Sequence, residues 1–470
     1  MNLPASFTSR MQEILGPEYA AFVESLSQPA PVSIRINPFK INRLPNLEQV
    51  PWSEWGLYLN QRPSFTLDPW LHAGAYYVQE ASSMFLEQAI KQSVNLEEPL
   101  LALDLCGAPG GKATHLASLI NSDSLLVTNE VIRSRASILA ENVQKWGSGN
   151  VVVTNNDPRE FQKLPEFFDV MVIDAPCSGE GMFRKDHGAI NEWSDANVKL
   201  CAERQRRILM DVWEALKPGG VLVYSTCTFS PDENEENLAW LAAQQDVIPV
   251  ILSVPEEWGI KKESTGSLSG YRFYPHRVKG EGLFMAVVRK AGEANAVNLK
   301  KSKKPRLTPA TKQEKALVQD WLLQPERFEL VLEKEQVVAL PADWMPELEQ
   351  IYQHMRVVTG GIETAEIKKK NVNPLHGLAL SQYINPKAFT VEEVDFSTAL
   401  RFLHKEDIPL QQSENGWVLI QYKGRNLGWL KKLSNRTNNY YPKEWRIRMS
   451  IDEALQHSKP EEAFAVLPIA

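Results

Sequence analysis

The chain is poor in cysteine, in long apolar runs and in net positive charge. Its 470 residues include only four cysteines. That number is too small for a disulfide framework and is typical of a reducing compartment, where cysteine serves packing or chemistry. No apolar run approaches the roughly 20 residues of a membrane span. The first ten residues lack the basic and apolar regions of a secretory signal. We therefore expect a cytoplasmic protein with no membrane partner.

The charge balance excludes a uniformly basic nucleic-acid-binding surface. The net charge is −7, which still leaves room for local basic patches, because the distribution of charge matters more than its sum. The hydrophobic share of 43% is ordinary for a globular protein with a large core. The length suggests two to four domains, and a monomer is the default expectation.

The middle of the chain has the pattern of an α/β domain. Apolar runs typical of buried strands alternate with helical periodicity, which predicts a parallel sheet with helices on both faces. Strands are predicted at residues 100–105, 125–129, 151–154, 168–173, 221–224 and 284–288. Helices are predicted at residues 81–93, 112–120, 133–146, 198–216 and 232–245. A tight turn is predicted at residues 217–220, where a proline precedes two glycines.

Changes in composition divide the chain into five predicted segments. These are an N-terminal extension packed on the core (1–75), the α/β core (76–290), a basic linker (291–312) and two small α+β domains (313–385 and 386–470). Within the extension, a strand is predicted at 32–37, with Arg35 and Asn37 on a solvated face. In the last domain a strand is predicted at 416–422.

The C-terminal segment has a local excess of basic residues. Residues 401–450 contain ten Lys or Arg against four Asp or Glu, an excess of six. Trp429, Tyr440, Tyr441 and Trp445 lie among these charges. Basic and aromatic side chains together suit phosphate contact and base stacking. The alternative is a charged surface over a few core aromatic residues.

A glycine-rich turn between the first predicted core strand and the next helix indicates a cofactor site. It consists of Cys106, Gly107, Ala108, Pro109, Gly110, Gly111 and Lys112. Glycines let the backbone approach a ligand, and the helix N-terminus offers free N–H donors. NAD-binding proteins share this feature, and the glycines could serve the turn alone.

Acidic residues after successive strands favour one cofactor. Glu130 follows the second strand, where it can accept hydrogen bonds from ribose hydroxyls. Asp157 follows the third, within reach of an adenine amino group or as a simple turn cap. Asp174 ends the fourth, and Arg135 on the following helix completes the candidate cofactor residues. Carboxylates suit a cofactor with cationic and donor groups, which favours S-adenosylmethionine. No metal site is indicated.

Two cysteines are predicted to face the same crevice as this cofactor. Cys177 follows Pro176 after the fourth strand, and Cys227 follows Thr226 after the fifth. Reactive groups of an open parallel sheet lie beyond the carboxyl ends of its strands. Both thiols should therefore lie near Asp174. The other two cysteines, Cys106 and Cys201, are interpreted as small buried hydrophobic residues.

These motifs resemble those of the Nol1/Nop2/Sun family of RNA cytosine-C5 methyltransferases. The matching stretches are YVQEASS (77–83), DLCGAPGGK (104–112), DAPCSG (174–179), STC (225–227), RFYPH (272–276) and GLF (282–284). The tail, from GRNLGW (424–429) to YYP (440–442), is similar to the bacterial branch that modifies 16S ribosomal RNA and ends in a PUA-like RNA-binding domain. The resemblance implies a Rossmann-like, S-adenosylmethionine-dependent core and ribosomal RNA, within the small subunit, as partner.

The resemblance also implies roles for four side chains. Cys227 would add to C6 of cytosine, because a covalent adduct turns one hard step into two easier ones. Cys177 would assist release of the adduct. Asp174 would hydrogen-bond the pyrimidine ring, and Lys112 would hold that carboxylate. The chain departs from the family pattern at Gly107, which is often alanine, and in the Pro158 that follows Asp157.

Three alternatives remain open. A DNA cytosine-C5 methyltransferase would use the Pro-Cys cysteine as nucleophile, but the Glu141-Asn142-Val143 stretch that could match that class precedes Pro176 instead of following it. A non-catalytic ribosome-assembly protein would have no use for two such thiols. A dehydrogenase would explain the glycine turn and leave Cys227 without a purpose.

Overall fold

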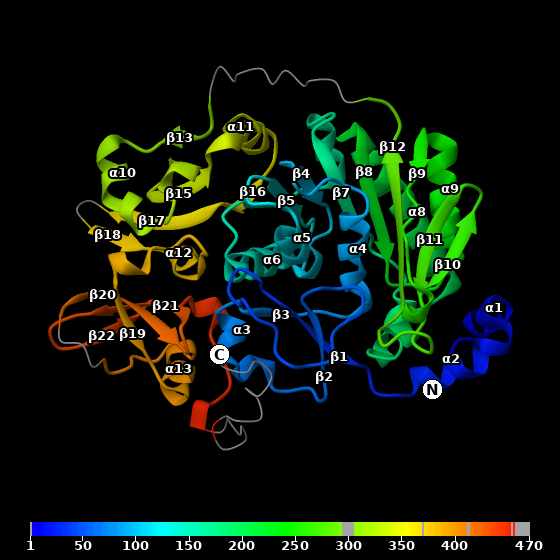
Figure 1. The fold of residues 1–470 in the computed structure, drawn as a ribbon, viewed down its shortest axis with the longest axis horizontal. Coiled ribbons are helices and arrows are strands. Elements are labelled where there is room, and N and C mark those ends of the chain that lie inside the picture. Colours follow the sequence, from blue (N-terminus) through cyan, green and yellow to red (C-terminus); the bar gives the residue numbers. More distant parts are fainter. Residues whose placement is uncertain (1, 294–304, 369–370, 411–413, 453–454, 456–470) are drawn as a thin grey trace.

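The computed structural model describes the whole chain except residues 1, 294–304, 369–370, 411–413, 453–454 and 456–470, and Figure 1 shows its arrangement. A ten-stranded sheet forms its centre, in the order β10-β11-β12-β8-β7-β4-β5-β6-β16, with β9 paired to β12. Its strands are β4 (Leu101–Asp104), β5 (Leu125–Asn129), β6 (Val151–Thr154), β7 (Phe168–Asp174), β8 (Leu216–Thr226), β9 (Val247–Pro249), β10 (Lys261–Thr265), β11 (Leu268–Phe273), β12 (Leu283–Lys290) and β16 (Val357–Gly360). The sheet confirms the predicted α/β core.

The parallel centre of this sheet has a crossover between β4 and β7. The chain runs from β4 outward to β5 and β6, then returns to place β7 and β8 on the other side of β4. Ligands of open α/β sheets bind beyond the carboxyl ends of the strands where the order reverses. The topology therefore directs attention to the ends of β4 and β7.

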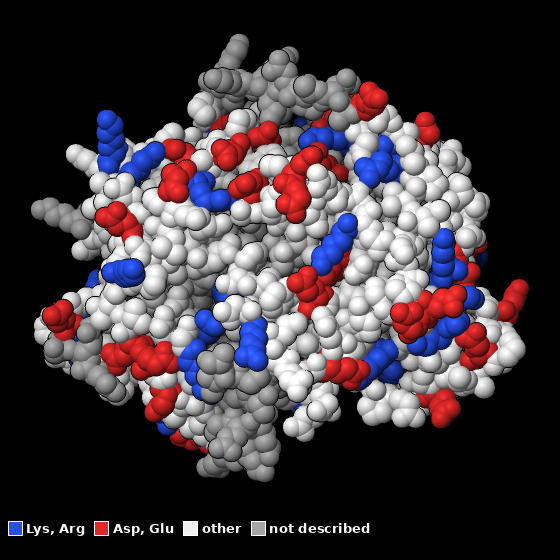
Figure 2. Space-filling model, in the orientation of Figure 1, with Lys and Arg blue, Asp and Glu red and all other residues white. Residues whose placement is uncertain are grey.

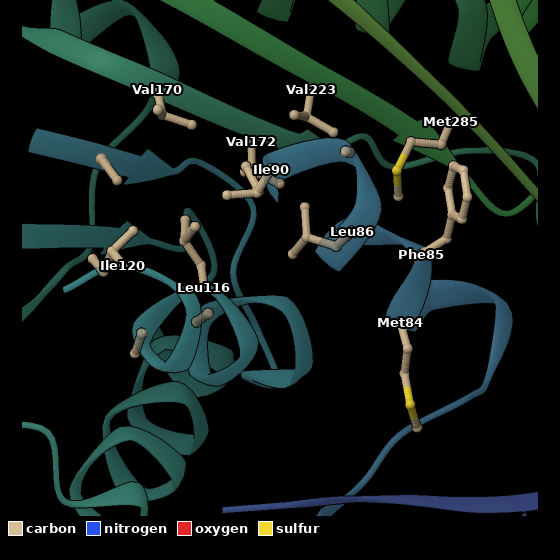
Figure 3. Close-up of a cluster of buried hydrophobic side chains, with 14 of the residues drawn as sticks. Met84, Phe85, Leu86, Ile90, Leu116, Ile120, Val170, Val172, Val223 and Met285 are labelled. Carbon is tan, nitrogen blue, oxygen red and sulfur yellow. The ribbon is translucent and has the colours of Figure 1, made fainter. Parts of the chain in front are cut away.

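Helices cover both faces of the sheet, and apolar side chains fill the space between. The core helices are α4 (Leu86–Lys91), α5 (Gly111–Leu119), α6 (Arg133–Trp146), α7 (His187–Glu192), α8 (Asp195–Trp213) and α9 (Glu235–Gln244). Figure 3 shows Leu86 and Leu116, from α4 and α5, facing Val172 and Val223 of the sheet. Fully burying one such side chain contributes about 1.5–3 kcal/mol. A second cluster, built on α8 and α9, covers the opposite face.

The prediction that residues 217–220 form a turn before the next strand is wrong. Strand β8 begins at Leu216, and these four residues lie inside it as an irregularity in the ladder with β7. Gly219 adopts a φ of +75°, which an L side chain rarely adopts. The glycines thus allow a bulge in a strand instead of a boundary before it. The predicted helix over residues 81–93 is also shorter, since it divides into a 3-10 turn (Ser82–Phe85) and α4.

In the described residues, the N-terminal segment forms three α-helices and a small antiparallel sheet. Its elements are α1 (Ala5–Leu15), α2 (Tyr19–Leu26), β1 (Val32–Ile36), β2 (Gly56–Leu59), α3 (Pro69–His72) and β3 (Tyr76–Val78), with strand order β2-β1-β3. The predicted solvated face of β1 is wrong, because Arg35 is 1% and Asn37 0% exposed. Arg35 donates to Gln79 Oε1 at 2.7 Å and to Thr114 Oγ1 at 2.6 Å. The polar side chain of Arg35 therefore forms hydrogen bonds with residues of the core instead of with water.

The segment after the core builds a second sheet and extends the first. Strands β13 (Thr308–Pro309), β14 (Phe328–Glu333), β15 (Gln336–Pro341), β17 (Ile362–Lys368) and β18 (Asn371–Pro374) form a five-stranded sheet with α10 (Lys312–Val318), α11 (Met345–His354) and α12 (His376–Leu380). Strand β16, from the same segment, pairs antiparallel with β6 of the core sheet. The lysines of the predicted basic linker, Lys300, Lys301, Lys303 and Lys304, lie outside the described residues.

The last segment contains a four-stranded sheet and the helix α13. It contains β19 (Thr390–Glu393), α13 (Phe396–Leu403), β20 (Gly416–Tyr422), β21 (Arg425–Lys432) and β22 (Thr437–Asn439). Strand β20 coincides with the predicted strand. Two of its predicted stacking aromatics are core residues instead, because Trp429 is 1% and Tyr441 0% exposed, whereas Tyr440 is 43% exposed. Over the described part of the chain, no helix combines the length and apolarity of a membrane span.

Candidate active site at the sheet crossover

The two predicted thiols meet beyond the carboxyl ends of β7 and β8. Cys177 Sγ lies 2.9 Å from Cys227 Sγ, and the backbone N–H of Cys227 donates to Cys177 Sγ at 3.3 Å. Adjacent parallel strands bring them together, because Asp174 of β7 is in register with Ser225 of β8. Sequence analysis predicted this meeting from the strand ends alone. Cys201 is 4% exposed on α8, as predicted for a buried hydrophobic residue.

An ion pair stands beside the thiols. Lys112 Nζ lies 2.9 Å from Asp174 Oδ2, and Ser225 Oγ donates to Asp174 Oδ1 at 2.7 Å. The Lys112 side chain is 10% exposed and that of Asp174 38%. Burial disfavours the charged lysine, but Asp174 outweighs it and the pKa of Lys112 is raised. The site therefore holds a fixed cation and an accessible carboxylate.

Cys227 affects the ionisation of Cys177. The hydrogen bond to Cys227 is the main cause that raises the pKa of Cys177 well above its ordinary value, and burial adds to it. The Cys177 thiol is therefore kept protonated. By contrast, burial raises the pKa of Cys106, which makes that thiol unreactive.

The glycine turn is shaped for close approach. A Cβ at Gly107 would lie 2.1 Å from Thr128 Oγ1, so no larger residue fits there without movement. Gly110 precedes α5 with a φ of +123°. Arg135 donates to the carbonyl of Ala108 at 2.8 Å, and Asn142 donates to that of Pro109 at 2.7 Å. The following helix α6 thus holds the turn from outside.

The predicted carboxylates Glu130, Asp157 and Asp174 lie at or after the ends of β5, β6 and β7. A fourth carboxylate, Asp104 at the end of β4, was not predicted. Asp104, the last residue of β4, is fully buried, and within the described residues its oxygens lack a hydrogen bond of good geometry, although the nearby Thr128 hydroxyl acts to lower its pKa. Burial, followed by the nearby Asp174, raises its pKa to about 7. Its position at the strand end was the signal that could have identified it. Glu130 accepts from the N–H of Ile132 at 2.8 Å and lies 3.3 Å from Arg135.

Asp157 has a structural partner of its own. Its side chain caps the 3-10 helix Pro158–Lys163, accepting from the N–H of Arg159 at 3.1 Å. It also pairs with the Arg159 side chain, and that hydrogen bond lowers its pKa. The capping alternative is therefore present in the structure, and an adenine contact stays a prediction.

These residues fit the cofactor that the sequence favoured. A buried carboxylate without a hydrogen bond of good geometry, at Asp104, is costly unless a ligand donor or cation reaches it. The tight packing of Gly107 on Thr128 and the backbone angle of Gly110 both require glycine, which keeps these two positions of the turn free of side chains. Acidic side chains at Asp104, Glu130 and Asp174 suit a cofactor with an ammonium group and hydroxyl donors better than one with phosphates.

A parallel sheet with this crossover, a glycine turn after β4 and carboxylates at the strand ends define a Rossmann-like methyltransferase. Three family descriptions match the chain: 16S rRNA methyltransferase RsmB/F over residues 91–289, the N-terminal domain of 16S rRNA methyltransferase RsmF over 3–81, and the methyltransferase RsmF PUA domain over 389–447. The chain belongs to the RsmF branch of the Sun family.

Individual relatives agree over nearly the whole length. Ribosomal RNA small subunit methyltransferase F of Vibrio vulnificus (strain YJ016) is 32% identical, covering 94% of this chain and 97% of that protein. The Aliivibrio fischeri (strain ES114) protein of the same name is 33% identical with the same coverage. A solved methyltransferase homologue from Pyrococcus horikoshii is 29% identical with a TM-score of 0.51, covering 60% of this chain and 94% of that one. NSun6 from the same organism, solved with SFG, shares the fold at 21% identity and a TM-score of 0.52, covering 62% of this chain and 99% of that one.

Proposed function

We propose that the chain methylates C5 of a cytosine in 16S ribosomal RNA and uses S-adenosylmethionine as the methyl donor. The observation that carries the proposal is the pair of thiols 2.9 Å apart, beside the ion pair of Lys112 and Asp174. A single thiol suffices for many covalent reactions. Two adjacent thiols suit a reaction in which one sulfur forms the adduct and the other helps to resolve it.

The first step makes C5 nucleophilic. The thiolate of Cys227 adds to C6, and the electron pair of the C5–C6 double bond moves onto C5 and into the ring. Asp174 accepts a hydrogen bond from the exocyclic amino group and orients the base. Lys112 holds that carboxylate in place through the ion pair. The glycine turn, Asp104 and Glu130 would hold S-adenosylmethionine, which would supply the electrophilic methyl group.

The last step restores the aromatic ring. Once Cys227 is bonded to C6, it no longer raises the pKa of Cys177, and the Cys177 thiol gives its proton to solvent. The Cys177 thiolate then accepts the C5 proton, the C5–H electron pair re-forms the double bond, and Cys227 leaves as a thiolate. The target cytosine must be unpaired or flipped out for a sulfur to reach C6.

RNA binding is assigned to the surfaces around this site. Figure 2 shows Lys and Arg interspersed with Asp and Glu on one face of the molecule. On such a mixed surface, phosphate contacts are expected at local basic patches. We propose the basic β20–β22 sheet as this patch. We propose a monomer that acts on RNA of the small ribosomal subunit, the substrate in the names of its relatives.

The decisive experiment separates the two sulfurs. We expect Cys227→Ala to abolish methyl transfer while RNA and cofactor still bind. Cys177→Ala should instead accumulate a covalent protein–RNA adduct, visible as a slow band on a denaturing gel. Cys201→Ala is the matched control, since that thiol is buried on α8, and it should behave like the wild type.

Two results would contradict the proposal. Turnover retained in Cys227→Ala would place the nucleophile elsewhere. A covalent adduct that depends on Cys177 would favour the assignment known from DNA methyltransferases, in which the Pro-Cys cysteine is the nucleophile. Labelled cofactor offered with ribosomal RNA and with duplex DNA tests the substrate directly. Bisulfite sequencing of ribosomal RNA from a deletion strain would then locate the modified cytosine.

A further inference from the structure

Two buried carboxylates tie the cysteine loops to each other. Glu180, on the loop after β7, accepts a hydrogen bond from the backbone N–H of Phe229, on the loop after β8, at 3.1 Å. Glu233, reached through the β8 loop, accepts from the backbone N–H of Ser178 at 2.9 Å and from its hydroxyl at 2.5 Å. Each of the two loops therefore places a carboxylate against a backbone N–H of the other loop.

The two carboxylates differ in how their charge is balanced. Glu233 is held by Ser178 and by the amide of Gln205 at 2.9 Å, and burial raises its pKa. Glu180 is completely buried and paired with a cation, because Arg10 Nη2 of helix α1 contacts its Oε1. The indole N–H of Trp193 donates to the same oxygen at 2.9 Å. The charge of Glu180 is thus balanced from the N-terminal segment.

The backbone around Glu180 leaves little room for movement. The N–H of Gly181 donates to the carbonyl of Cys227 at 2.9 Å. A Cβ at Gly181 would lie 2.9 Å from that carbonyl and 2.4 Å from the carbonyl of Gly282. Residues 180 and 181 therefore each form a hydrogen bond with the backbone of the loop that carries Cys227.

Helices α1 and α2 pack on both loops, as Figure 1 shows for their place beside the core. The ring centroid of Phe7 lies 5.1 Å from that of Phe183, on the β7 loop. The ring of Phe22 lies 5.2 Å from that of Phe229, on the β8 loop. The N-terminal helices thus form one apolar cluster with the segments that carry the two sulfurs.

We propose that Arg10 and Glu180 are positioning residues, through which helix α1 sets the placement of Cys177 relative to Cys227. Without Arg10, a buried Glu180 must take up a proton or leave its site, and either change weakens its bond to the Cys227 loop. Neither residue touches the substrate. The inference rests on the proposed function, since the spacing of the sulfurs matters for turnover only if both act on one base.

The kinetic test removes the charge while keeping the packing. Arg10→Met retains an apolar stem against Phe7 and Trp193. We expect kcat to fall about 10- to 100-fold, the cost of a misplacement on the order of 1 Å, with KM for RNA within about twofold. Arg10→Lys keeps the cation and should lose less. The double variant with Glu180→Gln should recover about threefold or more over Arg10→Met, because no uncompensated charge stays buried.

The control is Arg43→Met, an exposed arginine of the same segment, which should match the wild type and so exclude a general charge effect on RNA. A second readout needs no methyl transfer: the pH profile of alkylation of Cys177 and Cys227 by iodoacetamide, followed by peptide mass spectrometry. We expect Arg10→Met to shift this profile and Arg43→Met to leave it unchanged. Wild-type profiles and kcat in Arg10→Met would overturn the proposal. A shifted profile in an enzyme whose wild type methylates no cytosine would support the positioning role and refute the proposed function.

Discussion

At the carboxyl edge of the core sheet, a largely buried lysine is paired with a carboxylate, whereas the C-terminal sheet carries its charged side chains on the surface. Lys112 is 2.9 Å from Asp174, and its side chain is only 10% exposed. On the β21–β22 side, no ion pair within the described residues joins Lys431, Arg436 or Lys443 to a carboxylate. The two regions therefore place the same residue types in different environments, one largely buried and one exposed to solvent.

The difference shows how chemistry and recognition divide within one chain. A buried pair acts at short range in a medium of low polarity, so a small displacement has a large effect on a reacting group. Exposed cations act through a screened field, and each contributes little alone. Single substitutions should therefore be severe at the edge and mild, but additive, on the C-terminal sheet.

The largest effect is expected at the edge. Lys112→Met removes the cation from Asp174, and we expect kcat to fall about 100- to 1000-fold through loss of electrostatic support for the base. Methyl transfer to ribosomal RNA at saturating cofactor measures it. The matched control is Lys217→Met, whose 2.7 Å pair with Asp169 lies at the opposite edge of the sheet. Equal losses in both variants would show that the pairs matter only for folding.

The next effect tests the C-terminal sheet. The triple variant Lys431→Ala, Arg436→Ala and Lys443→Ala should raise KM for RNA about tenfold and leave kcat unchanged, because phosphate contacts bind without reacting. The slope of log KM against log salt should fall by about two to three. Arginine in place of Lys431 and Lys443 should preserve the slope. A change in kcat with an unchanged salt slope would refute the division between the two regions.

A smaller, pH-dependent effect is expected at Asp104. Its pKa of about 7 in the folded protein means that the carboxyl is largely protonated at pH 6 and ionised at pH 8. A cationic cofactor prefers the ionised form, so affinity should rise up to about tenfold across that range. Asp104→Asn should flatten the dependence, as measured by calorimetric titration.

The same substitution has a consequence for stability, with a defined sign. The folded pKa lies above the unfolded value, so the protonated carboxyl stabilises the fold at low pH, and stability falls as pH rises from about 4 to 7. Asp104→Asn should remove this loss from the ligand-free protein. An unchanged pH profile of unfolding in urea would show that Asp104 does not titrate in this range.

The smallest effect is expected at Asp157. Asp157→Ala removes the cap of the helix Pro158–Lys163 and should lower the free energy of unfolding by about 1 kcal/mol. Asp157→Asn can still cap and should restore that loss. Cofactor affinity measured on both variants decides the second role, because an unchanged Kd would remove Asp157 from the cofactor site.

Local sequence was sufficient for the elements that hold the site. Helix α6 spans Arg133–Trp146, the bounds that the sequence pattern predicted, and Gly147 ends it with a left-handed backbone. The two thiols meet because each follows a buried strand, and neighbouring parallel strands end at one edge. These predictions need only spacing along the chain.

Two of the failed predictions, those for Arg35 and Trp429, share one cause. The alternation in β1 separates polar from apolar side chains, but it does not say that the core covers the polar face around Arg35. In the same way, aromatic residues among basic ones could stack on RNA or fill a core, and Trp429 fills one. Periodicity identifies a face, and only the packing of distant segments decides what lies against it.

The sequence by itself determined the strand-end motifs, the alternation of strands and helices in the core and the residue types that face its crevice, because these depend on local periodicity and on the rules of parallel connection. Only the tertiary structure decided that Arg10 reaches Glu180 and that Arg35 reaches the start of α5. Such partners lie far apart along the chain, and their pairing depends on how the N-terminal segment docks as a body. Burial makes those pairings strong, and burial is a property of the assembled fold.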